Sequence, residues 1–342
     1  MTGNIDHETM SFYIEKSLDD VSEIPLGQML YDVGCTLIQD ITFVSKSGDA
    51  ASFSWEDIAE TVTIDESGEI SLEDGTTYQP AEIQIIPNPL LTLIDFSIKD
   101  ISPTIAFALG LPEFPDAEGK VLFEDKADHA VMILLDGTQY QKLTALVNAG
   151  RLPFLKETAT IQMGLTVYPP ITTSASAALL TSLSPRANGV FGYGYRTTES
   201  VTLFDLAVQE GKTVVAIEGN NLPFNLQNAE TSLSGDRDEN GYYDDNVFEK
   251  SLEIIHENMP DLLYIHFHEI DDMGHSYGPE SEEYQAAIER VDSYLGEIYQ
   301  ALPENTLIAI FADHGMHSTN QGGNHGALIA SNLIIPIIFL EK

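Results

Sequence analysis

The chain has 342 residues, of which 43% are hydrophobic and 20% are charged. This is enough apolar material for a packed core, and it argues against an intrinsically disordered chain. With 15 Lys and Arg residues against 54 Asp and Glu residues, the formal net charge is −39, which repels phosphate backbones and excludes a nucleic-acid-binding scaffold.

The beginning of the chain contains no recognisable targeting segment. Residues 1–6 have neither the basic nor the apolar part of a signal peptide, and no run approaches the roughly 18 apolar residues of a membrane span. We therefore predict no transmembrane segment. An extracytoplasmic location, with a leader absent from this sequence, is slightly favoured over a cytoplasmic one.

Residues 1–121 predict a small β-rich accessory module, either α+β or mostly β. Turn-forming Gly, Ser and Asp residues separate its short β segments, and residues 26–32 are compatible with a helix. The expected strands are 41–44, 51–55, 61–64 and 82–86. The only cysteine of the chain, Cys35, excludes an internal disulfide and a thiolate zinc cluster. Pro112 to Gly119 is interpreted as a linker to the next domain.

Residues 122–342 alternate between strand and helix patterns, which predicts an α/β domain with a mostly parallel sheet between helices. The run from His129 to Leu135 is apolar throughout, as in a strand that is buried on both faces. The other expected strands are 161–167, 213–217, 262–267, 307–311 and 333–340. The expected helices are 139–149, 172–181, 203–209, 247–257 and 282–301.

Acidic residues and histidines follow the predicted strands of this domain. Open α/β sheets place their active sites at the carboxyl ends of the strands, so these side chains are expected to converge. Carboxylates and imidazoles together suit zinc, and manganese is an alternative. The four places are Asp136-Gly137, Asp271-Asp272-Met273-Gly274-His275 on a glycine-loosened turn, Asp313-His314-Gly315, and Gly323-Asn324-His325-Gly326.

A run of hydroxyl side chains lies where a predicted loop enters a helix. Thr172, Thr173, Ser174 and Ser176 occupy this position. The free N–H groups and the dipole of a helix N-terminus stabilise incoming anionic oxygens. Two divalent ions beside such a hydroxyl would make it a nucleophile for phosphate-ester hydrolysis.

Taken together, these motifs resemble the alkaline phosphatase superfamily, and in particular its type I phosphodiesterase/nucleotide pyrophosphatase branch. The resemblance covers about 125–342 and implies an alkaline-phosphatase-like core. It implies Thr172 as the nucleophile, with Thr173 as the fallback, and two divalent ions, usually zinc. One ion would be held by Asp271, His275 and His325, and the other by Asp136, Thr172, Asp313 and His314.

The sequence also departs from this family. Many members carry a phosphate-binding asparagine where this chain has Phe191-Gly192-Tyr193, which puts a preference for diesters in doubt. Asn188 is expected to shape its own turn. The sulfatase branch is disfavoured, because no Cys or Ser occurs in that branch's Cys/Ser-x-Pro-x-Arg context. A small cap is expected at about 190–250.

Two further features of the sequence are not assigned a catalytic role. His266 and His268 are expected to pack in the core or to support the ligands rather than to react. Asp236 to Asp244 resembles the start of an EF-hand loop and is a candidate calcium site, but Val247 replaces the final Glu of that motif, so a solvated acidic turn is the preferred interpretation.

We therefore predict a metal-dependent hydrolase of small-molecule phosphate esters, in which Thr172 carries a phosphoryl intermediate. A phosphomonoesterase, a phosphonate hydrolase and a phosphotransferase to an alcohol are alternatives within the same superfamily. The alternative from another class is a non-catalytic surface binding protein that docks through residues 1–121. The sequence leaves the substrate and the oligomeric state open.

Overall fold

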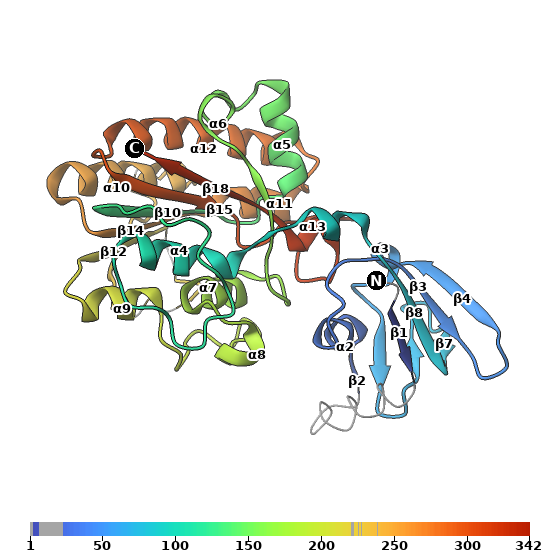
Figure 1. Ribbon diagram of the computed structural model, residues 1–342. Helices are drawn as coiled ribbons and strands as arrows, with labels where there is room; N and C mark the ends of the chain where they lie inside the picture. The colour runs from blue at the N-terminus through green and yellow to red at the C-terminus, as the bar shows by residue number, and fades with distance from the viewer. Residues whose placement is uncertain (1–2, 7–22, 220–221, 225, 227, 238) are drawn as a thin grey trace. The chain divides into compact units, whose positions relative to one another are not determined.

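The computed structural model describes residues 3–6, 23–219, 222–224, 226, 228–237 and 239–342 (Figure 1). Their contacts divide the chain into two compact units. Unit 1 is Met1–Ile94 with Gly326–Leu333, and unit 2 is Asp95–His325 with Ile334–Lys342. None of the described helices is both long and apolar enough to cross a membrane.

Unit 2 is built on a mostly parallel, eight-stranded sheet in the order β13-β12-β14-β10-β15-β18-β11-β9. Only β18 runs antiparallel to its two neighbours, β15 and β11. The strands are β9 (Phe96–Ser97), β10 (His129–Leu135), β11 (Gln162–Leu165), β12 (Val214–Glu218), β13 (Glu230–Leu233), β14 (Leu262–Phe267), β15 (Thr306–Phe311) and β18 (Ile334–Glu341).

Helices cover both faces of this sheet, because its central strands are apolar on both sides. Alternate residues of β10 belong to two separate cores: Met132 packs with α4, α7 and α9, and Ile133 with α5, α6, α10, α11 and α12. Figure 1 shows the two helical layers on opposite sides of the sheet. The first layer is α4 (Ile101–Ala108), α7 (Thr172–Thr181) and α9 (Leu203–Gln209), and the second is α5 (Tyr140–Ala149), α6 (Pro153–Thr158), α10 (Asp244–Asn258), α11 (Glu269–Tyr277) and α12 (Glu282–Ala301).

Smaller elements complete unit 2. They are the 3₁₀ helix η2 (Ile98–Asp100), the short helix α8 (Pro185–Asn188) and the hairpin of β16 (His317–Thr319) with β17 (Gly322–Asn324). The hairpin packs against α11. This contact brings the segment that ends at His325 close to the helix that carries His275.

The predicted α/β fold is confirmed, because the strand and helix alternation produces the predicted sheet between two helical layers. Local signals fix several helix ends. The α5 helix ends at Gly150 with φ +75°, and Thr202 and Asp205 form a reciprocal capping box at the start of α9.

Two parts of unit 2 differ from the prediction. Asp271 to His275 was expected as a loosened turn, but it lies inside α11, where a spacing of four places both side chains on one helix face. The predicted boundary at 121 also lies later than the observed one at 94. Residues 95–121 include β9 and α4, which bury Ile101 and Ile105 in the core of unit 2.

Unit 1 contains two small antiparallel sheets, in the orders β1-β8-β3-β4 and β2-β5-β6-β7, so the predicted β-rich module is confirmed. Its strands are β1 (Gly3–Asp6), β2 (Glu23–Pro25), β3 (Ile38–Val44), β4 (Ala50–Ser54), β5 (Thr63–Asp65), β6 (Ile70–Ser71), β7 (Thr77–Tyr78) and β8 (Glu82–Pro87). Its helices are α2 (Leu26–Asp32), α3 (Trp55–Ile58), η1 (Pro89–Leu93) and α13 (Ala330–Leu333).

The returning segment 326–333 is built into unit 1 through Trp55. The Trp55 side chain is fully buried, and its Nε1–H donates a 2.7 Å hydrogen bond to the carbonyl oxygen of Leu328. Leu328 is itself buried. This bond joins residues 273 positions apart, so unit 1 is complete only when the distant segment is present.

We expect Trp55→Phe to lower the free energy of unfolding of unit 1 by about 2 kcal/mol, because the buried Leu328 carbonyl loses its donor and a small cavity forms. Urea unfolding followed by circular dichroism measures the change, since Trp55 is the only tryptophan. Val33→Ala, at an exposed position, is the control and should change it by less than about 0.5 kcal/mol. Equal effects of the two variants would contradict the role assigned to this bond.

Candidate functional site

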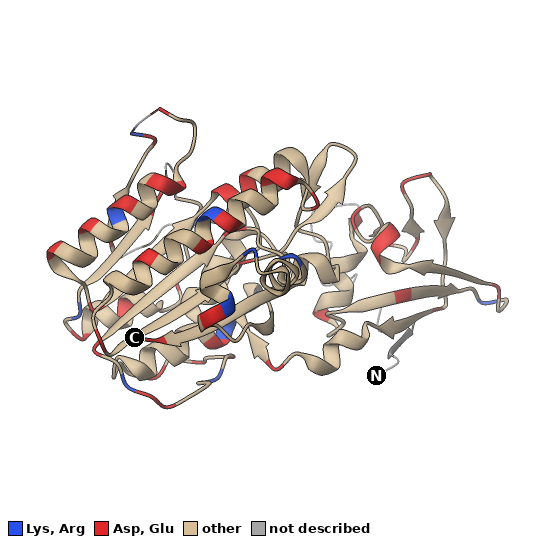
Figure 2. Cartoon of the chain, turned by 90° about the horizontal axis from the view of Figure 1, so that it is seen from above, with Lys and Arg blue, Asp and Glu red and all other residues tan. Residues whose placement is uncertain are grey.

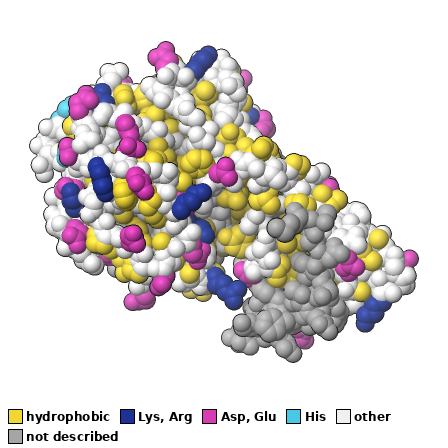
Figure 3. Space-filling model, in the orientation of Figure 1, with side chains coloured by type: hydrophobic (Ala, Val, Ile, Leu, Met, Phe, Trp, Pro, Cys, Tyr) yellow, Lys and Arg dark blue, Asp and Glu magenta, His cyan; other side chains and the backbone are white. Residues whose placement is uncertain are grey.

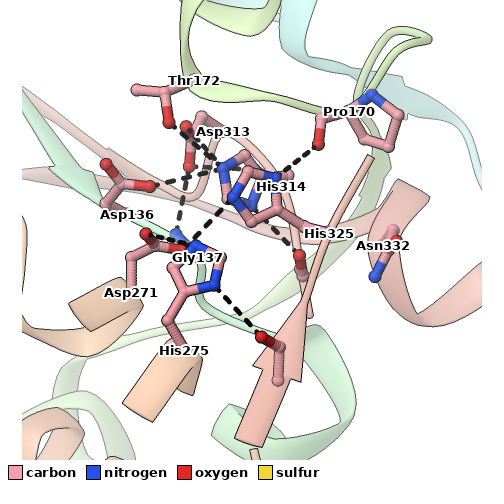
Figure 4. A network of polar contacts seen from close by, with 12 residues as sticks. Asp136, Gly137, Pro170, Thr172, Asp271, His275, Asp313, His314, His325 and Asn332 are labelled. Carbon is pink, nitrogen blue, oxygen red and sulfur yellow. Dashed lines mark hydrogen bonds and ion pairs between the residues drawn. The ribbon is translucent and has the colours of Figure 1, made fainter. Parts of the chain in front are cut away.

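The candidate residues meet at the carboxyl edge of the unit 2 sheet. Asp136 follows β10 directly, and Asp313 with His314 follows β15, which is the neighbour of β10. Asp271 and His275 are on α11, which begins just after β14 on the other side of β10. Thr172 is the first residue of α7, and His325 follows β17. Figure 4 shows these side chains facing one another.

The turn after β10 is held by a tyrosine from α12. The buried Tyr284 hydroxyl donates a 2.8 Å hydrogen bond to the Gly137 carbonyl and accepts one of 2.9 Å from the Gln139 N–H. Gly137 has φ +67°, and a Cβ atom there would lie 2.6 Å from Asp271 Oδ1. A glycine is therefore required, both for the backbone conformation and for the close approach of the Asp271 carboxylate.

The first cluster, which we call the Asp271 group, contains Asp271, His275 and His325. Its candidate ligand atoms lie within 4.8 Å of one another. Asp271 Oδ2 is 3.2 Å from His275 Nε2, and Asp271 Oδ1 is 3.8 Å from His325 Nε2. These are the three residues that the family resemblance assigns to one ion.

The second cluster, the Asp136 group, contains Asp136, Asp313 and His314, again with ligand atoms within 4.8 Å. His314 Nε2 is 3.3 Å from Asp313 Oδ2 and 3.5 Å from Asp136 Oδ1. It is also 3.3 Å from Thr172 Oγ1. All seven residues named from the sequence are thus brought together in the two predicted sets.

The three imidazoles of these groups are oriented by the backbone. In each, Nδ1 lies 3.1 Å from a carbonyl oxygen, and Nε2 faces the carboxylates. An N–H at Nδ1 that donates to the carbonyl leaves a lone pair at Nε2, which is the form that a metal ion binds. The pairs are His275 with Gly323, His314 with Gly315 and His325 with Pro170.

Three carboxylate oxygens of the two groups receive no hydrogen bond within the described part of the chain. Asp136 Oδ1, Asp271 Oδ1 and Asp313 Oδ2 are buried and accept no hydrogen bond from the described residues. Their ion pairs within this part of the chain are all with histidines. Lys and Arg are few and dispersed along the chain in Figure 2, and Figure 3 shows acidic side chains spread over the visible face. Buried carboxylate oxygens that receive no hydrogen bond, next to imidazoles whose Nε2 atoms face them, are suitable ligands for divalent cations.

The pKa shifts follow from this crowding. Burial, and then the neighbouring Asp313 and Asp271 carboxylates, raise the pKa of Asp136 well above its usual value. Burial also opposes ionisation of Asp271, but its hydrogen bond with His275 and the charges of nearby histidines lower its pKa to about 2. The same hydrogen bond raises the pKa of His275 to about 9. Any cation at the Asp271 group would therefore displace a proton from His275 at neutral pH.

Thr172 is better placed than Thr173 to act as a nucleophile. Both are buried in the first turn of α7, but only the Thr172 hydroxyl contacts the candidate ligands. Among the described residues, Thr173 Oγ1 has no hydrogen-bond partner. Asn188 shapes its own turn, as predicted, because its side chain bonds the backbone of Leu183 and Val190.

Sequence reasoning missed two contributors to the site. Tyr193, from the segment that departs from the family pattern, places its hydroxyl 3.5 Å from His325 Nε2. Glu218, the last residue of β12, is buried and contacts both His266 and His268. A glutamate that ends an apolar strand carries no motif, and only the strand order shows what lies beside it.

The choice between a solvated acidic turn and a calcium site at Asp236 to Asp244 stays open, because Asp238 lies outside the described residues. Asp236 accepts hydrogen bonds from the backbone N–H groups of Asn240 and Gly241. Both oxygens of the buried Asp244 carboxylate accept hydrogen bonds from outside this segment, from the backbone N–H groups of His268 and Glu269.

Comparison with known proteins confirms the resemblance. Residues 223–335 match the model of the family described as type I phosphodiesterase / nucleotide pyrophosphatase. This segment includes Asp271, His275, Asp313, His314 and His325. The family match supports an enzyme that acts on phosphoester bonds.

Curated relatives are matched over short segments only. The chain is 38% identical over 74 residues to GPI ethanolamine phosphate transferase 3 of Eremothecium gossypii, covering 21% of this chain and 7% of that protein. It is 35% identical over 86 residues to GPI ethanolamine phosphate transferase 2 of Saccharomyces cerevisiae, covering 24% and 10%. The matches therefore span a tenth or less of these relatives' length.

The fold is also found among solved structures. A putative sulfatase from Bacteroides thetaiotaomicron superposes with a TM-score of 0.53 and 14% identity, covering 64% of this chain and 65% of that chain. At this identity the likeness concerns the fold alone.

We expect Gly137→Ala to weaken zinc binding by about 10- to 100-fold, because the added Cβ displaces the Asp271 carboxylate. Competition titration of the metal-free protein against a chromophoric chelator measures the affinity. Gly235→Ala is the matched control: its φ is also +67°, but nothing lies within 4 Å of the added Cβ. If both variants bind zinc as the parent does, the Asp271 carboxylate is not a ligand.

Proposed function

We propose that this protein is a metal-dependent phosphoester hydrolase that uses Thr172 as its nucleophile and two divalent ions, zinc or manganese, as its cofactors. The observation that carries the proposal is the position of the Thr172 hydroxyl. It lies 3.3 Å from His314 Nε2, beside the carboxylates and imidazoles of the Asp136 group, which are buried. A structural threonine at a helix start needs no such surroundings.

The chain's own residues supply orientation and binding. Thr172 begins α7, so the free N–H groups of the first turn are near its hydroxyl and stabilise incoming phosphoryl oxygens. Divalent ions, when bound, would polarise the phosphoryl group and favour ionisation of the hydroxyl. Thr172 Oγ1 then forms a bond to phosphorus as the ester oxygen leaves. Water attacks the phospho-threonine in the second step and restores the hydroxyl.

Tyr193 is a candidate contact to the substrate. Its hydroxyl reaches His325, although the residue is 58% exposed. Burial of the hydroxyl, and then the Asp271, Asp136 and Asp313 carboxylates, raise the pKa of Tyr193. The phenol therefore stays protonated and can donate to a phosphoryl oxygen. This donor would replace the asparagine that the sequence lacks.

We expect Thr172→Val to lower kcat with a phosphodiester or monoester substrate by on the order of 10³-fold or more, because the attacking oxygen is removed. Thr173→Val changes the neighbouring hydroxyl in the same way and should retain activity within about threefold. Exhaustive chelation should abolish turnover, and added zinc or manganese should restore it.

Loss of activity in Thr173→Val alone would transfer the role to that residue. A protein that keeps full turnover after chelation would overturn the mechanism. If the protein is instead a non-catalytic binding protein, Thr172→Val should leave its biological activity unchanged.

Phosphoryl transfer is the second candidate, and the names of the matched relatives favour it. GPI ethanolamine phosphate transferases are named for passing a phosphate-containing group to an acceptor rather than to water. The proposed first step would be the same in this chain. Only the second step changes, because an alcohol oxygen would attack the group held on Thr172 in place of water.

If the protein transfers the phosphoryl group to alcohols, we expect an added alcohol to divert part of the product from hydrolysis to a new phosphate ester. The protein is incubated with p-nitrophenyl phosphate, its bis-ester and its phenylphosphonate ester, with and without ethanolamine or glycerol. Transfer gives the new phosphate ester, detected by mass spectrometry, at the expense of the hydrolysis product. A product distribution that does not change with alcohol identifies a hydrolase.

A further inference from the structure

A buried methionine lies between the two segments that carry the histidines of the Asp271 group. Met316 is fully buried and follows Asp313-His314-Gly315 directly. Its side chain contacts α11, which carries His275, and β17, which leads to His325. Met316 is not a candidate ligand, and no motif of the sequence identified it. Its position nevertheless connects the supports of both ion groups.

The α11 helix and the β17 strand approach each other through glycines. A Cβ atom on Gly322 would overlap the carbonyl oxygen of His275. A Cβ atom on Gly323 would lie 2.7 Å from the carbonyl oxygen of Gly274. The His275 ring is part of this contact, because its Nδ1 is 3.1 Å from the Gly323 carbonyl oxygen. Backbone thus packs directly on backbone where the helix and the strand meet.

The Met316 side chain fills the space beside this contact. A Cβ atom on Gly274 would overlap the Met316 sulfur, and one on Gly323 would lie 2.7 Å from it. The sulfur is therefore packed against both glycines, one position before His275 and two positions before His325. An unbranched thioether is narrow and adaptable enough to pack between two backbones in this way.

The backbone of Met316 is held from another direction. Its carbonyl oxygen accepts a hydrogen bond from the buried side chain of Gln139. The backbone N–H of Gln139 in turn donates to the Tyr284 hydroxyl at 2.9 Å. Gln139 belongs to the turn that starts at Asp136, so the bond to Met316 joins the turns that follow β10 and β15. These two turns carry the Asp136 group.

We propose that Met316 is a positioning residue for both ion groups. Its sulfur sets the separation of His275 and His325, the two imidazoles that would share one ion. Its carbonyl oxygen, held by Gln139, ties this separation to the turn that carries Asp136. This role rests on the proposed function, because it concerns the residues that would hold the two ions.

The separation of the two imidazoles matters because zinc accepts a narrow range of ligand positions. The ring centroids of His275 and His325 are 5.0 Å apart, and both Nε2 atoms face Asp271. Zinc–nitrogen bonds are about 2.0–2.1 Å long, and the ligands of a site must be held to within about 0.5 Å. Without the Met316 side chain, α11 and β17 lose the contact that fixes their spacing, and the ion at the Asp271 group is bound more weakly.

The test compares zinc affinity with stability and needs no activity. Zinc binding to the metal-free, full-length protein is titrated against a chromophoric chelator, and the urea midpoint of unfolding is measured on the same metal-free protein. We expect Met316→Ala to weaken binding of one of two zinc ions by about 10- to 100-fold. Met316→Leu keeps a methyl group near the position of the sulfur and should bind zinc within about threefold of the parent.

Met132→Ala is the matched control for the cavity. Met132 is as fully buried as Met316, but it lies inside β10 and packs in the core with α4, α7 and α9. Its removal should lower the urea midpoint about as much as Met316→Ala does, while zinc affinity stays within about twofold of the parent.

A milder pair of variants decides the case in which Met316→Ala does not fold. Gln139→Met removes the donor to the Met316 carbonyl and should weaken zinc binding by about tenfold. Gln141→Met makes the same change at an exposed position of α5 and should bind zinc as the parent does.

The positioning role is overturned if Met316→Ala and Met132→Ala change zinc affinity equally, or if neither Met316→Ala nor Gln139→Met changes it. Met316→Leu that binds zinc as weakly as Met316→Ala also overturns it, because the occupied space would then not be what matters. A parent that binds no zinc overturns the two-ion proposal together with this role. Unchanged affinity in the variants of a zinc-binding parent overturns this role alone.

Discussion

The structure of the candidate site depends on one electrostatic constraint: several carboxylates lie close together, and no Lys or Arg of the described residues pairs with them. Asp136, Asp271 and Asp313 converge from three places in the chain, and their described ion pairs are with histidines alone. An imidazole whose Nδ1–H donates to a backbone carbonyl can compensate this charge only by taking a second proton at Nε2, which is the nitrogen that a metal ion would bind. Divalent cations at Nε2 would compensate the charge in place of these protons.

This convergence follows from the sheet order. Because β12, β14, β10 and β15 are parallel neighbours, the residues at their carboxyl ends form a continuous row, from Glu218 through His266 and Asp136 to Asp313. The row lies on the same side of the sheet as α7, since alternate residues of these strands pack with that helix. A hydroxyl at the start of α7 therefore faces the row without any special loop.

Much of this was predictable from local patterns. Apolar runs fixed β10, β14 and β15, and a polar residue directly after each run identified Asp136 and Asp313. The spacing of Asp271 and His275 indicated a shared ligand pair, but the glycine before His275 was misread as a sign of a turn. In the structure, Gly274 lies within α11, where a Cβ would meet Met316. The pairing of Glu218 with two histidines depends on strand order, which no local pattern specifies.

The path of the chain after His325 has a consequence for how the two units can be separated. The chain leaves unit 2 at that residue, runs through Gly326–Leu333 in unit 1, and only then returns as β18. Each unit is therefore discontinuous in sequence. A protease cut between positions 94 and 95 would leave two fragments that stay associated, with Trp55 of one holding Leu328 of the other, and a gene fragment that ends at 94 would encode an incomplete fold.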